Sequence, residues 1–251
     1  MLSSIPEDEN LLYSFGSGGI TKSESKLLSS CIAVTANKNE KETYMKVILI
    51  NGSPHENGST RAALDDIIEE LQDNRIETKL YWVGMKAVHG CIACGKCNET
   101  HRCIFNEDIV NEVLDDMDHA DGIIVGTPTY YAGANGTLEC IMDRLFYAGN
   151  NFAHKPAAAI AVARRAGTNA AIDDLTKYFT ISQMPLATSV YWPMEFGGNA
   201  EQTREDAEGR YVMKRLGANM AWLLKCIDAG KKADIRPPKD TGDRPWTNFI
   251  R

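Results

Sequence analysis

The sequence predicts an α/β fold in which a mostly parallel, five-stranded sheet is covered by helices on both faces. Two observations lead to this prediction. Short apolar runs alternate with amphipathic segments of helical period between Met45 and about residue 230, and such alternation is typical of a doubly wound sheet. Hydrophobic residues also make up 43% of the 251 residues, which is enough for one good-sized core.

The elements up to residue 127 follow from hydrophobic periodicity. An apolar run predicts a buried strand over 46–51, and a stripe of Ala, Leu and Ile predicts an amphipathic helix over 59–73. Residues 77–83 alternate polar and apolar side chains, as an edge strand does. A loop rich in Cys and Gly follows, and then a polar helix is expected over about 106–119. Residues 122–127 predict another buried strand.

The rest of the chain continues this alternation. We expect a helix over about 136–148, a strand over 157–163, a helix over about 168–179 and a fifth strand over 184–192. The last element is a long helix over about 200–229. Its expected inner stripe is Tyr211, Met213, Leu216, Met220, Leu223, Leu224 and Ile227.

The two ends of the chain differ from this pattern. Residues 1–44 are rich in Ser and charge, include Gly16-Ser17-Gly18-Gly19 and show no sustained hydrophobic period. We therefore expect a disordered N-terminal extension, or a gene start placed too early with Met45 as the natural beginning. Residues 231–251 are rich in Pro and charge and are expected to form an irregular tail. The folded domain is thus expected to span 45–230.

Composition excludes several kinds of partner. The formal net charge is −7 and the sequence has no basic run, so neither nucleic acid nor an anionic membrane surface is an expected partner. No apolar stretch approaches the ~20 residues of a membrane span, and the sequence predicts no secretory signal. We therefore expect a cytoplasmic protein whose seven cysteines stay reduced, so that clustered cysteines indicate metal or redox chemistry.

The loop after the first strand reads Gly-Ser-Pro-His-Glu-Asn-Gly-Ser-Thr over 52–60. Amides and hydroxyls at the start of the next helix form an anion site, because the helix dipole favours negative charge there. The loop lacks both the lysine of triphosphate-binding loops and the Gly-x-Gly-x-x-Gly of dinucleotide-binding folds, so a monophosphate fits better. The alternative is an ordinary capped βα turn. His55 is a candidate phosphate donor, with a surface histidine as the alternative.

Four cysteines share one short loop after the second strand. Cys91, Cys94, Cys97 and Cys103 follow the pattern Cys-x2-Cys-x2-Cys-x5-Cys, and four thiolates so spaced can hold a cube of iron and sulfide. A zinc ion with four thiolate ligands and unligated cysteines that pack a tight loop are the alternatives. His89 is expected to be structural rather than a ligand.

Two more unusual loops follow the third and fourth strands. Thr127-Pro128-Thr129-Tyr130-Tyr131-Ala132-Gly133 pairs two tyrosines with small residues, and the rings can lie against a flat heteroaromatic ring. The alternative is a surface turn with a packed tyrosine. Arg164-Arg165-Ala166-Gly167 can place guanidinium charge near a ring or a phosphate, with a solvated pair as the alternative. All four loops are expected at one edge of the sheet, because parallel strands share their carboxyl edge.

No residue is predicted to act as a catalytic acid or base. The sequence contains no Gly-x-Ser-x-Gly, no His-Glu-x-x-His and no credible Ser/His/Asp set, which weakens hydrolase interpretations. Asp143 and Arg144, in the helix after the third strand, are expected to form a local structural ion pair.

These motifs, in this order, resemble the NADPH-dependent FMN reductase-like flavoproteins of the flavodoxin fold. The spacing of the four cysteines looks most like the iron-sulfur flavoproteins within that group. The resemblance covers about residues 45–230 and implies a flavodoxin-like sheet in the order 2-1-3-4-5, bound FMN, and association into a homodimer or homotetramer.

The resemblance also implies site residues. The FMN phosphate would be held by Ser53, His55, Ser59 and Thr60. The isoalloxazine ring would be flanked by Pro128, Thr129, Tyr130 and Tyr131, on the loop that ends at Gly133, and reached from its far side by Arg164, Arg165 and Gly167.

The implied function is an FMN-dependent oxidoreductase. It would take hydride from NAD(P)H and reduce a quinone, a nitro or azo compound, free flavin or an electron carrier. The alternative is an electron-transfer protein with a [4Fe-4S] cluster on the cysteine loop. A third hypothesis is a non-catalytic module whose cysteines hold zinc.

Overall fold

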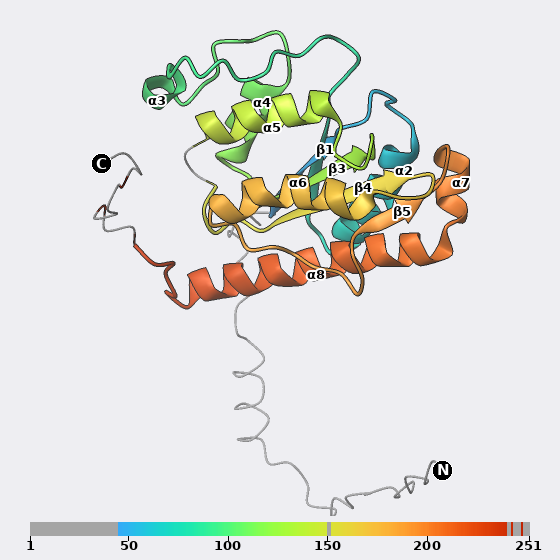
Figure 1. Ribbon diagram of the computed structural model, residues 1–251. Coiled ribbons are helices and arrows are strands. Elements are labelled where there is room, and N and C mark those ends of the chain that lie inside the picture. Colours follow the sequence, from blue (N-terminus) through green and yellow to red (C-terminus); the bar gives the residue numbers. More distant parts are fainter. Residues whose placement is uncertain (1–44, 150–151, 240–241, 243–246, 248–251) are drawn as a thin grey trace, which may run out of the picture. The chain divides into compact units, whose positions relative to one another are not determined.

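A computed structural model describes residues 45–149, 152–239, 242 and 247 (Figure 1). Its centre is a sheet of five parallel strands in the order β2-β1-β3-β4-β5. The predicted flavodoxin-like order is therefore confirmed. The strands are β1 (Lys46–Asn51), β2 (Glu77–Trp82), β3 (Gly122–Pro128), β4 (Ala157–Ala163) and β5 (Met194–Phe196).

Helices cover both faces of this sheet, as predicted (Figure 1). One face carries α4 (Val110–Met117), α5 (Gly136–Ala148) and α6 (Thr168–Ile181). The other face carries α2 (Ser59–Asp73) and α8 (Ala207–Lys232). Two short helices complete the fold, α3 (Cys97–Thr100) and α7 (Ala200–Glu205).

Each face of the sheet has its own hydrophobic core, because successive strand residues point to opposite sides. In β1, Ile48 and Ile50 belong to the core shared with α4, α5 and α6. Val47 and Leu49 belong to the core shared with α2 and α8. The sheet is thus buried on both faces, which leaves the carboxyl ends of the strands as its ligand-binding edge.

The fifth strand lies later in the chain than predicted. The strand predicted over 184–192 is wrong, because apart from an isolated bridge at Leu186 this segment forms no strand. Pro185 and Pro193 lack the N–H group that a sheet ladder needs, and Trp192 is exposed. The apolar residues of this segment therefore belong to a surface loop.

The predicted long final helix is interrupted at Asp206. The Asp206 carboxylate accepts hydrogen bonds from the backbone N–H groups of Gly209 (2.9 Å) and Phe196 (2.8 Å), so it caps α8 and ties it to β5. The prediction that Tyr211 lies on the inner stripe is wrong, since its side chain is 58% exposed. The other predicted residues of that stripe are buried or half-buried: Met213, Leu216, Met220, Leu223, Leu224 and Ile227.

Two boundaries also differ from the predictions. The polar helix expected over 106–119 begins only at Val110, and α8 continues to Lys232, past the expected start of the tail. The expectations for residues 1–44 lie outside the described residues. Within 45–149 and 152–239, no helix is long and apolar enough to cross a membrane.

Candidate functional site

Three of the loops predicted to share the carboxyl edge of the sheet contact one another. The β1–α2 loop is joined to β3 by a hydrogen bond from the Gly52 N–H to the Gly126 carbonyl (2.8 Å), and to the β3–α5 loop by one from the Asn135 side chain to the Gly52 carbonyl (2.7 Å). The β4–α6 loop packs on the β3–α5 loop at Gly167, where a Cβ atom would lie 2.7 Å from the Ala132 Cα. The expected juxtaposition therefore holds for three of the four loops. The prediction that the cysteine loop shares this edge is wrong, because its cavity is lined by Tyr147 and Ala148 at the far end of α5.

The start of α2 is open to an anion. Among the described residues, no side chain caps this helix, and its first turn holds no acidic residue. The backbone N–H groups and hydroxyls of Ser59 and Thr60 make no hydrogen bond in this part of the chain. Free donors at the positive end of a helix dipole attract a phosphate. This helix start therefore fits the phosphate group that the sequence predicts.

A short hydrogen-bond network shapes the loop before α2. The Asn51 side chain accepts from the Ser53 N–H (3.1 Å) and donates to the Glu56 carbonyl (3.0 Å). The buried Ser53 hydroxyl accepts from the N–H of the exposed His55 (3.1 Å), and the Trp82 indole donates to the Ser53 carbonyl (2.8 Å). Sequence reasoning missed Asn51 and Trp82, although a polar residue that ends a buried strand is a usable signal.

The two tyrosines of the β3–α5 loop belong to a tight turn. Tyr130 and Gly133 exchange both backbone hydrogen bonds at 3.0 Å, and the residues between them, Tyr131 and Ala132, have φ angles of 49° and 60°. Two left-handed residues between such a pair are typical of a type I′ turn, which usually contains Gly or Asn. Here the turn instead holds a fully exposed Tyr131. Left-handed non-glycine residues of this kind cluster at ligand sites.

Thr129 carries a buried polar atom without a partner. Its Oγ1 atom is buried and has no hydrogen-bond partner within the described residues. An unpaired buried hydroxyl costs free energy, and a ligand that bonds to it removes that cost. Together with the open start of α2, this atom makes the edge of the sheet suitable for FMN.

The two arginines after β4 are exposed. The Arg164 side chain lies along Gly198, where a Cβ atom would be 3.9 Å from its Cγ and Cδ. The loop after β5 thus reaches the same edge, which sequence reasoning did not note. Gly167 occupies the N-cap position just before α6 with a φ of +92°, a conformation that favours glycine.

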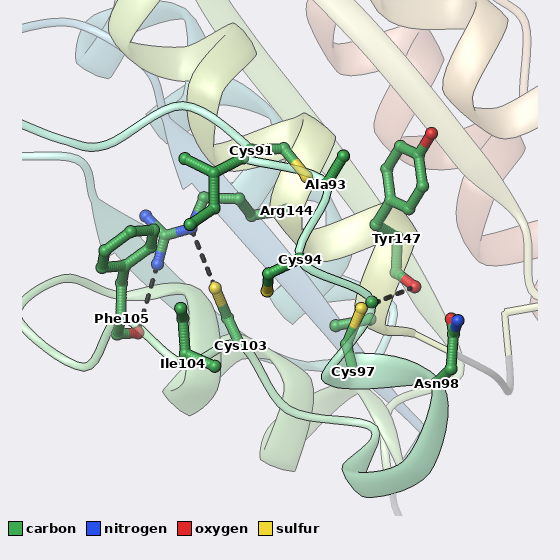
Figure 2. A pocket seen from close by; sticks show the side chains of 13 residues that line it. Cys91, Ala93, Cys94, Cys97, Asn98, Cys103, Ile104, Phe105, Arg144 and Tyr147 are labelled. Atoms are coloured by element: carbon green, nitrogen blue, oxygen red, sulfur yellow. Dashed lines mark hydrogen bonds between the residues drawn. The ribbon is translucent and has the colours of Figure 1, made fainter.

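All four predicted metal ligands line one cavity (Figure 2). The cavity has a volume of about 190 Å³. Its other lining residues are mostly apolar, including Ile104, Phe105 and Tyr147, and Asn98 and Arg144 add polar groups. The residues Cys91 and Cys94 are exposed, whereas Cys97 and Cys103 are half-buried.

The arrangement of the cysteines bears on the kind of metal centre that they could hold. No three His, Cys, Asp or Glu side chains in the described part of the chain converge as the ligands of a single metal ion do. A zinc site requires four thiolates around one centre.

A buried arginine, Arg144, also lines this cavity. The Arg144 side chain, 1% exposed, donates from Nε to the Cys103 Sγ (3.1 Å) and from its two Nη atoms to the Asp108 carboxylate and to the carbonyls of His89 and Phe105. Burial by itself lowers the pKa of this guanidinium, but the hydrogen bonds to Asp108 and Cys103 outweigh burial and raise the pKa. Arg144 therefore stays charged.

The predicted local ion pair between Asp143 and Arg144 is wrong. The two side chains leave α5 in different directions, and Asp143 instead accepts a hydrogen bond from the Tyr178 hydroxyl (2.5 Å). His89 has the structural role expected of it, since its ring stacks on Phe105 with centroids 4.4 Å apart.

Comparisons with known proteins match the chain to flavin-dependent proteins. The profile of the family described as NADPH-dependent FMN reductase matches residues 45–199. An iron-sulfur flavoprotein of Methanocaldococcus jannaschii is 31% identical over 192 residues, covering 73% of this chain and 99% of the relative. The NADPH azoreductase of Bacillus sp. (strain OY1-2) is 30% identical over 123 residues, covering 47% and 59%. The solved NAD(P)H:(acceptor) oxidoreductase FerB of Paracoccus denitrificans shares the fold, with a TM-score of 0.51 and 14% identity over 72% of this chain and 98% of that one.

Proposed function

Because the chain belongs to the NADPH-dependent FMN reductase family and, within it, to the iron-sulfur flavoproteins, we propose that it is an electron-transfer flavoprotein with a [4Fe-4S] cluster on its cysteine loop. Family membership makes the chain an FMN-binding oxidoreductase. The cluster, its ligands and the electron acceptor are the proposal.

The observation that carries the cluster proposal is the single cavity lined by Cys91, Cys94, Cys97 and Cys103. All four cysteines line this space, and the residues Cys91 and Cys94 are exposed to solvent, so iron and sulfide can reach the cavity. A bound cluster supplies one-electron chemistry, which complements the one- and two-electron chemistry of FMN.

The chain's own residues have binding and positioning roles. We assign the FMN phosphate to the free amides and hydroxyls of Ser59 and Thr60 at the start of α2, with Ser53 and His55 on the loop before it. The isoalloxazine is assigned to the turn from Pro128 to Gly133.

The unpaired hydroxyl of Thr129 is a hydrogen-bond group for the bound flavin. Arg164, Arg165 and Gly167 complete this assignment from the neighbouring loop. The guanidinium groups favour negative charge on the reduced ring.

The helix α5 joins the two proposed cofactor sites. It begins just after the flavin-side turn, and Tyr147, which lines the cysteine cavity, lies near its end. At 1.5 Å per residue, the helix axis from Gly136 to Tyr147 is about 16 Å long. FMN would thus be held near the start of this rigid helix and the cluster near its end.

A second candidate function is an NAD(P)H-dependent reductase of small acceptors such as quinones or nitro and azo compounds. The exposure of Tyr130 and Tyr131 favours it, because an open flavin face admits a planar substrate. Similarity to the azoreductase points the same way. Both candidates are consistent with the homodimer or homotetramer that we infer from the family, which light scattering would test.

The first test is an absorption spectrum of anaerobically purified protein, with iron, zinc and acid-labile sulfide measured on the same sample. We expect flavin bands, a broad shoulder and about four irons per chain. Flavin without iron, together with rapid NAD(P)H oxidation, would favour the reductase. Zinc without flavin would refute both functions.

The phosphate assignment has its own test. The Ser59→Ala, Thr60→Ala double variant is expected to release FMN, because it removes two donors at the start of α2. Thr180→Ala is the matched control, since that hydroxyl bonds to a carbonyl of its own helix, α6. Unchanged FMN affinity in the double variant would place the phosphate elsewhere.

A further inference from the structure

The guanidinium of Arg144 uses all of its hydrogen-bond donors inside the protein. An arginine has five N–H groups in a fixed plane, and five acceptors surround this one. Four are oxygen atoms: the carbonyls of His89 and Phe105, each at 3.2 Å, and both carboxylate oxygens of Asp108. The fifth is the Cys103 sulfur, 3.1 Å from Nε.

These contacts join α5 to four residues between β2 and α4: His89, Cys103, Phe105 and Asp108. Figure 2 shows the side chain reaching from the helix behind the cavity toward Cys103 and Phe105. A buried charge is costly unless it is paired and fully hydrogen-bonded. The oxygen contacts meet this need, because Asp108 balances the charge and the carbonyls use the remaining Nη donors. The contact with sulfur is therefore available for another role.

Hydrogen bonds to ligating sulfur atoms change the properties of an iron-sulfur cluster. The reduction potential depends on net charge, on hydrogen bonds to the sulfurs and on solvent exposure. An N–H donor withdraws electron density from a thiolate and stabilises the more negative, reduced cluster. Cys103 receives such a bond from a charged, buried donor, whereas Cys91 and Cys94 are exposed.

We propose that Arg144 is a positioning residue that holds Cys103 at the cavity and raises the reduction potential of the cluster through its Nε–H···Sγ hydrogen bond. This inference rests on the proposed function, since it requires a cluster on this loop. It predicts that changes to Arg144 and to Asp108, its buried partner, shift the reduction potential in opposite directions. Loss of Arg144 lowers the potential, and neutralisation of Asp108 raises it by leaving the guanidinium charge unbalanced.

The experiment compares four variants by EPR-monitored redox titration of anaerobically purified protein. Arg144→Gln removes the charge and the fork of donors. Arg144→Lys keeps the charge but not the planar fork. Asp108→Asn keeps Arg144 in place. The matched control is Arg102→Gln, because Arg102 precedes Cys103 in sequence, is exposed and pairs with Asp115, not with sulfur.

The expected order of reduction potentials is Arg144→Gln lowest, then Arg144→Lys, then wild type together with Arg102→Gln, and Asp108→Asn highest. FMN content and the iron-to-chain ratio are measured on every sample, so that a folding defect is recognised by lost flavin. If Arg144→Gln loses iron but keeps flavin, the positioning role is supported, and the Asp108→Asn potential tests the electrostatic role.

Two results would overturn the inference separately from the proposed function. Wild-type potentials in iron-replete Arg144 variants would show that the hydrogen bond does not affect the cluster. If the reduction potential of Arg102→Gln shifted as much as that of Arg144→Gln, the effect would come from loss of any nearby positive charge and not from the hydrogen bond to Cys103. Flavin-replete wild type without iron would instead refute the cluster itself, and this inference with it.

Discussion

Glu195 is a buried carboxyl group whose protonation should make the stability of this protein depend strongly on pH. It lies in β5 and is fully buried, and both of its oxygen atoms lack a hydrogen-bond partner among the described residues. Burial, assisted by the nearby carboxylates of Asp66 and Asp206 and opposed by Arg210, raises the pKa of Glu195 to about 8. At neutral pH the folded protein therefore holds Glu195 mostly protonated.

The sign of the effect follows from proton linkage. In the unfolded chain Glu195 has an ordinary pKa near 4.5, so between pH 4.5 and 8 the folded state binds one proton more than the unfolded state. The free energy of unfolding must then fall as pH rises, by about 1.4 kcal/mol per pH unit. The contribution is complete below pH 4.5 and is lost as pH rises toward 8. From pH 5.5 to 7.5 the loss amounts to roughly 2–3 kcal/mol.

The test is Glu195→Gln, a variant of similar shape that cannot ionise. Urea unfolding of both proteins, with saturating FMN, is measured from pH 5.5 to 8.5. The stability of the variant relative to wild type should increase by about 1.4 kcal/mol for each pH unit up to about 8. Glu201→Gln, at an exposed position in α7, controls for loss of a surface charge and should give no such slope. Parallel pH profiles for wild type and Glu195→Gln would refute the reasoning.

Three further predictions concern the loops at the carboxyl edge of the sheet. Gly167→Ala should lower both thermal stability and FMN affinity, because φ is +92° and the new Cβ would meet the Ala132 Cα at 2.7 Å. Tyr131→Gly should raise the stability of the FMN-free protein by about 1 kcal/mol through relief of a left-handed residue, yet weaken FMN binding in a fluorescence titration. Asn135→Ala should cost about 1–2 kcal/mol in urea unfolding, since this side chain caps α5 and bonds to the Gly52 carbonyl.

The parts of the fold that the sequence predicts are those with a strong local signal. The strands β1, β3 and β4 are short, continuous apolar runs, and α2 and α5 carry regular apolar stripes, so their positions follow from composition and period alone. The sheet order came from the family resemblance, because pairing between distant strands has no local signature.

The errors fall where a distant contact decides the structure. The strand β5 has only three residues and is fixed by pairing with β4, whereas the more apolar segment before it forms a surface loop. The long helical pattern near the C-terminus breaks at Asp206 because that side chain bonds to the backbone of β5. Neither fact can be read from a window of ten residues.

In the candidate site too, the features with a local sequence signal were predicted and those that depend on distant contacts were not. The cysteine spacing and the loop before α2 are contiguous motifs, and once the strands are known to be parallel, the shared edge of the loops after β1, β3 and β4 follows. The cysteine cavity lies instead at the far end of α5. The partners of Arg144 are not contiguous. They lie between 36 and 55 residues away along the chain, so the sequence offered only its neighbour Asp143 as a partner, and that prediction was wrong.

Arg144, whose partner was predicted wrongly, matters because of its position on α5. The helix is capped by Asn135, which also holds the phosphate-side loop through the Gly52 carbonyl. Two turns later the same helix carries Arg144 into the back of the cysteine cavity. A shift of α5 along its axis would therefore disturb the flavin-side loops and the Cys103 contact together. Because both sets of contacts are buried and directional, we infer that they fix one register of this helix and thereby hold the spacing between the two proposed cofactor sites constant.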